Sequence, residues 1–306
     1  MINCAALPAC LPALVLAPLF CSLIVRIKAL FAGRRGAPLL QPYFELLKLL
    51  RKDAVYSRTT TWLFRAGPVV SVAVALFALL LMPVAGEAAT LHFTGDLLLL
   101  MYLLALARLF SVLAALDTGS AFEGMGASRE AIFSALAEPA LVLALAALAR
   151  FTGELSLSEI YAHLDGALIL KFGPALVLVA ATLLVVILAE NARIPFDDPT
   201  THLELTMVHE VLILDHSGPD LAFIQYGAQL KLWLLSALLV NLALPVHTGL
   251  PVIDALCFLA GMGLFACAIG VLESCMARLR LVRIPQLLVG AGALSAIALV
   301  LALAKG

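Results

Sequence analysis

The sequence predicts an all-α, polytopic membrane protein with about eight transmembrane helices, on the strength of three observations. Of its 306 residues, 63% are hydrophobic and only 13% are charged. The mean hydropathy of +1.09 is far above the range of soluble globular proteins. Apolar runs of roughly 20 residues, the length that crosses the hydrocarbon of a bilayer, recur along the chain. The lipid bilayer is therefore an expected partner, whereas a net charge of −1 predicts no nucleic acid partner.

The apolar runs locate the expected spans in order. The first run has no basic segment before it and no clear cleavage site, so it is predicted to be a retained span rather than a signal peptide. Lys231 and Asn241 interrupt the sixth run, whose boundaries are the hardest to place. The eight predicted spans are residues 5–27, 66–86, 96–116, 131–151, 171–190, 228–246, 252–273 and 286–304.

Charges in the connections between spans predict the orientation of the chain. Residues 26–65 are rich in lysine and arginine, so the positive-inside rule places them in the cytoplasm and both termini on the outer, periplasmic side. Residues 276–283 contain three arginines and fall on the same cytoplasmic side. Residues 86–95 and 245–251 contain neither lysine nor arginine and fall outside, which agrees with this topology.

A short amphipathic segment lies within the first cytoplasmic connection. Residues 42–52 combine apolar side chains at helical spacing with basic ones, and they are too few to span a bilayer. We expect an amphipathic helix that lies in the membrane interface. A solvated loop that only obeys the positive-inside rule is the alternative.

Two charges fall inside the predicted spans. Arg108 lies about eight residues before the cytoplasmic end of the third span, and Glu138 about eight residues after the cytoplasmic start of the fourth. At ~1.5 Å per residue both would lie ~12 Å below that surface and could meet. Intramembrane charges are costly unless paired or hydrated, so both are candidate functional residues. A structural ion pair is one interpretation. A hydrated, proton-carrying site is the other, and Pro139 favours it because proline should open the helix locally.

Acidic residues gather on the predicted cytoplasmic side, where lysine and arginine normally prevail. This unusual distribution is a second pointer to ion handling. The residues are Asp117, Glu123, Glu130, Glu138, Glu190, Asp197, Asp198, Glu204, Glu210, Asp215, Asp220 and Glu273.

Three histidines recur every seven residues in the second cytoplasmic connection, residues 191–228. If the segment is helical until Gly218, His202, His209 and His216 share roughly one face, together with Glu204 and Glu210. The spacing is unlike that of zinc ligands on one helix, and it suits either a proton relay or a polar face that docks a soluble partner. Both remain open.

No resident cofactor is expected on this chain. Its six cysteines lie in or beside apolar runs without a CxxC pair, which predicts membrane-buried packing residues rather than metal ligands. The common nucleotide-binding, metalloprotease and serine-hydrolase motifs do not occur in the sequence. We therefore expect neither catalytic nor metal-binding residues.

Three stretches carry a resemblance to a known family. Residues 34–36 with 41–42 and 46–50 read RRG, QP and LLKLL, residues 190–197 read ENARIPFD, and residues 116–130 read LDTGSAFEGMGASRE. Together they resemble subunit 1 of respiratory complex I, also called its H subunit, and its relatives in group 4 nickel–iron hydrogenases, such as formate hydrogenlyase and hydrogenase-4 component C. The third stretch is similar to the hydrogenase branch.

The resemblance implies a single transmembrane domain over residues 1–306, in the bacterial inner membrane. It implies a non-catalytic subunit that anchors cytoplasmic iron–sulfur and hydrogenase-like subunits and joins them to antiporter-like membrane subunits. Iron–sulfur clusters, and a nickel–iron centre where one exists, would belong to those partner subunits. Glu138→Gln is expected to impair energy coupling while leaving assembly intact.

The residues expected to act form two groups. For the proton or ion path they are Glu138, Glu190, Asp197, Glu204, Glu123, Arg108, Arg193 and Glu210, with the two arginines tuning nearby pKa values. For docking of partner subunits they are Arg34, Arg35, Arg129, Glu130, His209 and His216.

Two departures from the complex I pattern leave quinone binding open. Residues 198–203 differ from the acidic stretch that follows the PFD element in complex I, and His216 replaces the tyrosine of its YSG element. The alternatives are a quinone-site subunit of an NADH:quinone oxidoreductase and a stand-alone secondary transporter. The transporter should show inverted repeats, and the sequence shows no convincing one.

Overall fold

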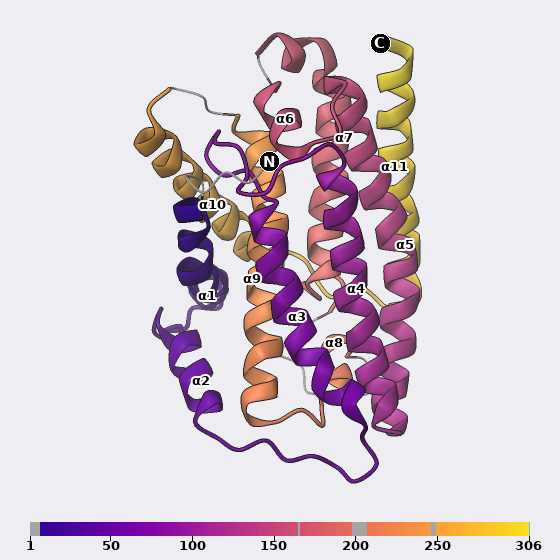
Figure 1. Cartoon of the computed structure of the whole chain (residues 1–306). Coiled ribbons are helices and arrows are strands. Elements are labelled where there is room, and N and C mark those ends of the chain that lie inside the picture. The colour runs from indigo at the N-terminus through magenta and orange to yellow at the C-terminus, as the bar shows by residue number, and fades with distance from the viewer. Residues whose placement is uncertain (1–6, 165, 198–206, 246–248, 306) are drawn as a thin grey trace.

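A computed structural model describes residues 7–164, 166–197, 207–245 and 249–305. Within these residues the chain is all-helical, and all eight predicted spans are present as long helices (Figure 1). The helices are α1 Leu7–Phe31, α2 Gln41–Leu50, α3 Trp62–Leu80, α4 Asp96–Asp117, α5 Ala121–Thr152, α6 Leu157–Ala162, α7 Gly166–Glu190, α8 His209–Leu212, α9 Gly218–Ala243, α10 Pro251–Cys275, the 3₁₀ turn η2 Leu281–Arg283 and α11 Ile284–Lys305.

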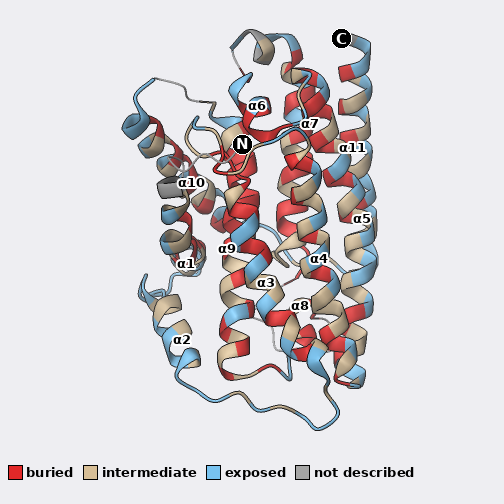
Figure 2. Cartoon of the chain, viewed as in Figure 1, coloured by how far each residue is buried: buried red, intermediate tan, exposed pale blue. Residues whose placement is uncertain are grey.

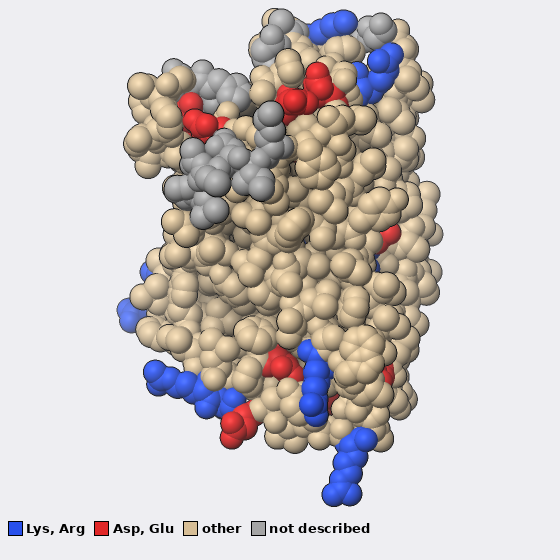
Figure 3. Space-filling view, viewed as in Figure 1, with Lys and Arg blue, Asp and Glu red and all other residues tan. Residues whose placement is uncertain are grey.

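The long helices are apolar on their outer faces as well as in the core. Figure 2 shows exposed and buried residues alternating along the outer helices. The exposed residues of the chain include Leu264 and Val300, which carry large aliphatic side chains. Figure 3 shows charged side chains gathered toward the two ends of one face, with a broad and largely uncharged band between them. In the part of the chain that the structure describes, eight helices are long and apolar enough to cross a membrane. A helix that is apolar all round outside a core is stable only in lipid or against another apolar surface.

Two helices begin about ten residues earlier than the hydropathy pattern predicts. α5 starts at Ala121 instead of 131, and α9 starts at Gly218 instead of 228. The predicted loop at 116–130 is therefore mostly helix, with only Thr118–Ser120 between α4 and α5. An apolar run marks the part of a helix that suits hydrocarbon, whereas the backbone hydrogen bonds continue through the polar residues beyond it. α5, with 32 residues, is about 48 Å long.

α2 is the predicted short helix, over Gln41–Leu50. Tyr43 donates a hydrogen bond to the carbonyl of Val15 and so ties α2 to α1. None of its residues is buried, and Phe44 and Leu47 are exposed. Its position in the membrane interface remains a prediction, as does the side of the membrane on which the termini lie.

The second cytoplasmic connection is not one continuous helix, so the predicted single histidine face is wrong for its described part. α8 covers only His209–Leu212, and His216 lies beyond it. Side chains replace the helical hydrogen bonds here: Asp197 accepts from the Val208 amide, and Glu123 accepts from the Asp215 amide. His202 and Glu204 lie outside the described residues.

A buried charge cluster and the cavity beside it

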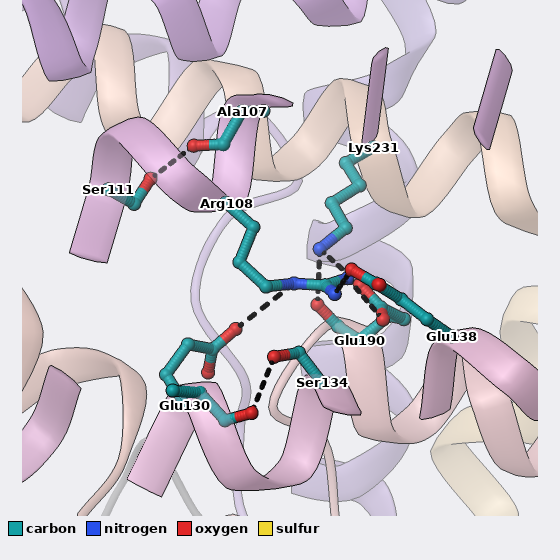
Figure 4. Close-up of polar contacts among 9 residues, drawn as sticks. Ala107, Arg108, Ser111, Glu130, Ser134, Glu138, Glu190 and Lys231 are labelled. Carbon is teal, nitrogen blue, oxygen red and sulfur yellow. Dashed lines mark hydrogen bonds and ion pairs between the residues drawn. The ribbon is translucent and has the colours of Figure 1, made fainter. Parts of the chain in front are cut away.

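Arg108 is the centre of a group of charges in the interior of the helix bundle. It comes from α4 and is buried, and its guanidinium contacts three carboxylates (Figure 4). One terminal nitrogen bonds Glu138 Oε1, and the other lies 2.5 Å from Glu190 Oε1. Its Nε lies 3.8 Å from Glu130 Oε1. The predicted meeting of Arg108 with Glu138 is thus confirmed.

Lys231 extends this group into α9. Its Nζ lies 2.7 Å from Glu190 Oε2 and donates a 2.8 Å hydrogen bond to the Glu190 carbonyl oxygen. Glu190, the last residue of α7, therefore lies between two cations. The residues of the central cluster, as we call this group, are Arg108, Glu130, Glu138, Glu190 and Lys231.

The central cluster joins four helices at one point: α4, α5, α7 and α9. Two formal positive charges face three formal negative ones. Removing such groups from water is costly, and they persist in an interior only when each has a partner of opposite sign. A proton added to or taken from any one carboxylate changes this balance, which is a physical requirement for an ion-handling site.

Pro139 follows Glu138 but does not interrupt α5, which continues from Ala121 to Thr152. The expected local opening of the helix is therefore limited to the one missing donor, because proline has no N–H for the carbonyl of Ala135.

A cavity of about 390 Å³ adjoins the central cluster. Arg108, Glu130, Glu190 and Lys231 line one part of it, and small residues of α3 and α4, such as Ala75 and Ala107, line another. Glu138 is not among the lining residues. The cluster is therefore in contact with the cavity through all of its members except Glu138.

Two further ion-pair groups lie around the connection that follows α7. Glu273 of α10 lies 2.9 Å from Lys28 Nζ and 3.4 Å from Arg193 Nη1. Asp197 lies 2.9 Å from Arg278 Nη2 and accepts a 2.8 Å hydrogen bond from the Val208 amide. These contacts fasten the connection to α1, α10 and the segment before α11.

Comparisons with known proteins decide the family. The model of the NADH dehydrogenase family matches residues 5–304. The chain belongs to this family. It is a multi-pass protein of the bacterial inner membrane, in keeping with its eight apolar helices and its bacterial relatives.

Named relatives lie in two groups. Hydrogenase-4 component C of Escherichia coli is 34% identical over 76% of this chain and 72% of that protein. Formate hydrogenlyase subunit 4 of the same organism is 33% identical over 75% and 73%. The H subunit of the NADH-quinone oxidoreductase of an Acidovorax species is 27% identical over 76% of this chain and 66% of that protein.

A solved structure supports the fold. A chain of the membrane-bound sulfane sulfur reductase, an archaeal respiratory membrane complex, superposes with a TM-score of 0.83 at 22% identity, over 97% of this chain and 98% of that one. The resemblance read from the sequence motifs is therefore confirmed for the family and for the architecture.

Within this NADH dehydrogenase family member, only part of the expected ion path is contiguous. Arg108, Glu138 and Glu190 are in contact. Arg193 and Asp197 instead belong to the Glu273 and Arg278 pairs. Two other expected residues do not belong to this contact: Glu123 is buried and accepts a hydrogen bond from the Asp215 amide, and Glu210 lines the cavity. Glu204 lies outside the described residues.

Several residues expected to dock partners face inward. Glu130 contacts Arg108, and Arg129 donates to the Met207 carbonyl. His209 and His216 line the cavity, and the His216 ring stacks on Phe64 with centroids 3.9 Å apart. Polar atoms of these residues thus already have partners within the chain, and their docking role stays a prediction. Arg34 and Arg35 are exposed, as docking requires.

Burial shapes the protonation of the two histidines. It lowers the pKa of His209 below its ordinary value, although the Glu130 carboxylate opposes this. Burial also lowers the pKa of His216 to about 4. Both imidazoles are therefore neutral near pH 7, and neither adds a positive charge to the cavity.

Sequence reasoning missed Lys231 and Glu273 as site residues. Lys231 interrupts a predicted span, and a lysine at that depth is itself a signal because of its cost. Glu273 is among the acidic residues of the predicted cytoplasmic side but not among the expected site residues, because only the folded chain brings Lys28 and Arg193 to it.

Proposed function

We propose that this chain is the membrane anchor and ion-coupling subunit of a group 4 hydrogenase-type, complex I-related oxidoreductase. In this role it links a cytoplasmic iron–sulfur and hydrogenase-like arm to antiporter-like membrane subunits. The supporting observation is the unbroken series of charge contacts from Lys231 through Glu190 and Arg108 to Glu138. The relationship to hydrogenase-4 component C and formate hydrogenlyase subunit 4 supports the type of complex.

The mechanism is electrostatic coupling between neighbouring ion pairs. Two unit charges 4 Å apart interact by about 4 kcal/mol at the effective dielectric of a protein near its surface. Protonation of Glu190 weakens its attraction for Arg108 and Lys231, and Arg108 then interacts more strongly with Glu130 and Glu138. A charge change on the cavity side of Arg108 is thereby passed to Glu138, on the other side.

The redox chemistry in this proposal belongs to partner subunits. Among the described residues, no group of three or more histidine, cysteine, aspartate or glutamate side chains could hold a metal ion. The exposed Arg34 and Arg35, in the basic connection after α1, are proposed to bind an acidic surface of the cytoplasmic arm.

Glu190→Gln in the purified complex, reconstituted into vesicles, tests the coupling. Glutamine keeps the shape and loses the charge between Arg108 and Lys231. We expect electron transfer to continue while ion translocation per electron falls at least about tenfold, measured with a pH- or sodium-sensitive dye.

The matched control is Glu45→Gln. Glu45 is an exposed carboxylate on α2 whose contact is with Gln41 of the same helix. This variant should translocate ions normally. Normal translocation by Glu190→Gln in a complex with all its subunits would reject the coupling role.

The cavity favours a second candidate function, binding of a quinone. Its volume of about 390 Å³ is within the range of small-molecule sites, and it combines an apolar wall on α3 with charged groups at the central cluster. A photoreactive quinone should label α3 in competition with unlabelled quinone. Ala75→Trp should abolish labelling by filling the cavity, whereas Val69→Trp on the exposed side of α3 should not. Labelling that no competitor reduces would contradict this function.

A further inference from the structure

Lys231 is one of two residues of the central cluster that both line the cavity and are partly exposed. Its side chain is 23% exposed, compared with 8% for Arg108 and 4% for Glu190. Among the cluster members that line the cavity, only Glu130 is similarly exposed, at 20%. A proton that reaches the cluster from the cavity therefore meets Lys231 or Glu130 first.

The ammonium group of Lys231 has one donor more than the surrounding protein accepts. It carries three N–H donors. Among the described residues its Nζ contacts two acceptors, Glu190 Oε2 at 2.7 Å and the Glu190 carbonyl oxygen at 2.8 Å (Figure 4). Because Lys231 lines the cavity, the third donor can bind a water molecule there.

Neither Arg108 nor Glu130 offers the same connection to Glu190. The guanidinium of an arginine stays protonated in proteins, so Arg108 cannot pass a proton on. Glu130 contacts Arg108 at 3.8 Å, and Arg108 lies between the Glu130 and Glu190 carboxylates. Lys231 contacts Glu190 directly, and a lysine amine can release and take up a proton.

The charges around Lys231 leave Glu190 as its partner for proton exchange. Arg108 contacts the other oxygen of the same Glu190 carboxylate. From α8, His209 is close enough for the charge of Lys231 to oppose its protonation, and burial keeps this imidazole neutral. The cavity-lining residues of α1 and α3 carry no charge. The other charged residues that line the cavity are Glu130, Arg193, Asp197 and Glu210.

We propose that Lys231 is the residue through which a proton from the cavity enters the charge series. In this step an N–H bond of Lys231 breaks and an O–H bond forms on Glu190 Oε2, across the 2.7 Å contact, so both groups become neutral. A protonated water molecule in the cavity then returns a proton to the amine. The net change is one proton moved from cavity water to Glu190, and no other reactant takes part.

This inference rests on the proposed function and adds the point at which the proton enters. Both oxygens of the Glu190 carboxylate already contact cations. A proton delivered along the existing contact with Lys231 reaches Glu190 without displacing Arg108 first. Glu190 then attracts Arg108 less strongly, which is the change that the coupling requires.

Lys231→Arg in the purified complex, reconstituted into vesicles, separates proton exchange from charge balance. Arginine keeps the positive charge and the donors but cannot give up a proton. We expect subunit recovery and electron transfer to remain, while proton translocation per electron falls at least about tenfold because a transfer step is lost. Lys231→His exchanges protons near pH 7, so it should translocate at least about threefold faster than Lys231→Arg. A role in charge balance alone predicts the opposite order.

The exposed Lys48 of α2 supplies the matched controls, and Lys48→Arg and Lys48→His should translocate normally. Normal translocation by Lys231→Arg overturns the proposal. If Lys231→Arg does not assemble, Lys231→His is compared with Lys231→Met, and equal translocation by these two overturns it. A loss in Glu190→Gln together with normal translocation in Lys231→Arg rejects proton entry at Lys231 and keeps the coupling role. Normal translocation in both rejects both.

Discussion

At the scale of single residues, Arg108 is the cation that three carboxylates of the central cluster share. Replacing it with glutamine leaves Glu130, Glu138 and Glu190 without their shared cation, and breaking a buried ion pair on one side costs about 3–5 kcal/mol. We expect the free energy of unfolding in detergent to fall by that order. Adding Glu138→Gln should recover part of the loss, because Glu138 pairs with Arg108 and its charge is left uncompensated, whereas Glu190 keeps its ion pair with Lys231. A double variant less stable than Arg108→Gln would contradict this account.

His216 predicts a pH dependence at the same scale. Its folded pKa of about 4 lies below the ordinary value of about 6.5, so the unfolded chain binds more protons between these values. Stability should therefore fall as the pH is lowered from about 6.5 toward 4. His216→Phe keeps the stack on Phe64 and removes the proton site, so melting temperatures against pH should show a smaller fall in this variant. Identical profiles would mean that other groups account for the pH dependence.

At the scale of elements, close packing of α10 on α1 depends on Gly270. A Cβ added there would lie 2.7 Å from Ile27 Cβ, and Glu273, which pairs with Lys28, is one turn further on. Gly270→Ala should lower the free energy of unfolding by about 1–3 kcal/mol. Gly263→Ala on the same helix meets nothing within 4 Å and should stabilise by up to about 1 kcal/mol. Equal effects of the two substitutions in unfolding titrations would argue against a close approach of α10 and α1.

At the scale of the whole molecule, the predicted orientation of the helices in the membrane can be tested with fusion proteins. The basic connection between α1 and α3 is expected in the cytoplasm and the C-terminal end of α11 in the periplasm. Alkaline phosphatase fused after Lys305 should be active and green fluorescent protein at the same point should be dark. A fusion after Arg278 should give the opposite result. Fluorescence of the fusion after Lys305 would mean that every helix crosses the membrane in the direction opposite to the predicted one.

The sequence predicts the helices well and the site only in part. Hydropathy finds all eight spans, but it places the starts of α5 and α9 ten residues late, because their first turns are polar. It also places Arg108 and Glu138 at one depth, and they do meet. The regular spacing of His209 and His216 suggests a continuous helical face, which the described residues do not form. The carboxylates of Asp197 and Glu123 accept hydrogen bonds from backbone amides of that segment instead.

What the sequence determines by itself is therefore the membrane architecture and the family. Both rest on local properties: the length and apolarity of each run, the bias of charges in the connections, and three motifs. Only the tertiary structure decides which charges become partners. Lys231 pairs with Glu190, Arg108 pairs with both Glu190 and Glu138, and Glu273 pairs with Lys28 and Arg193. These pairings join residues far apart in the chain, and a buried charge is stabilised by whatever lies within a few ångströms in space rather than in sequence.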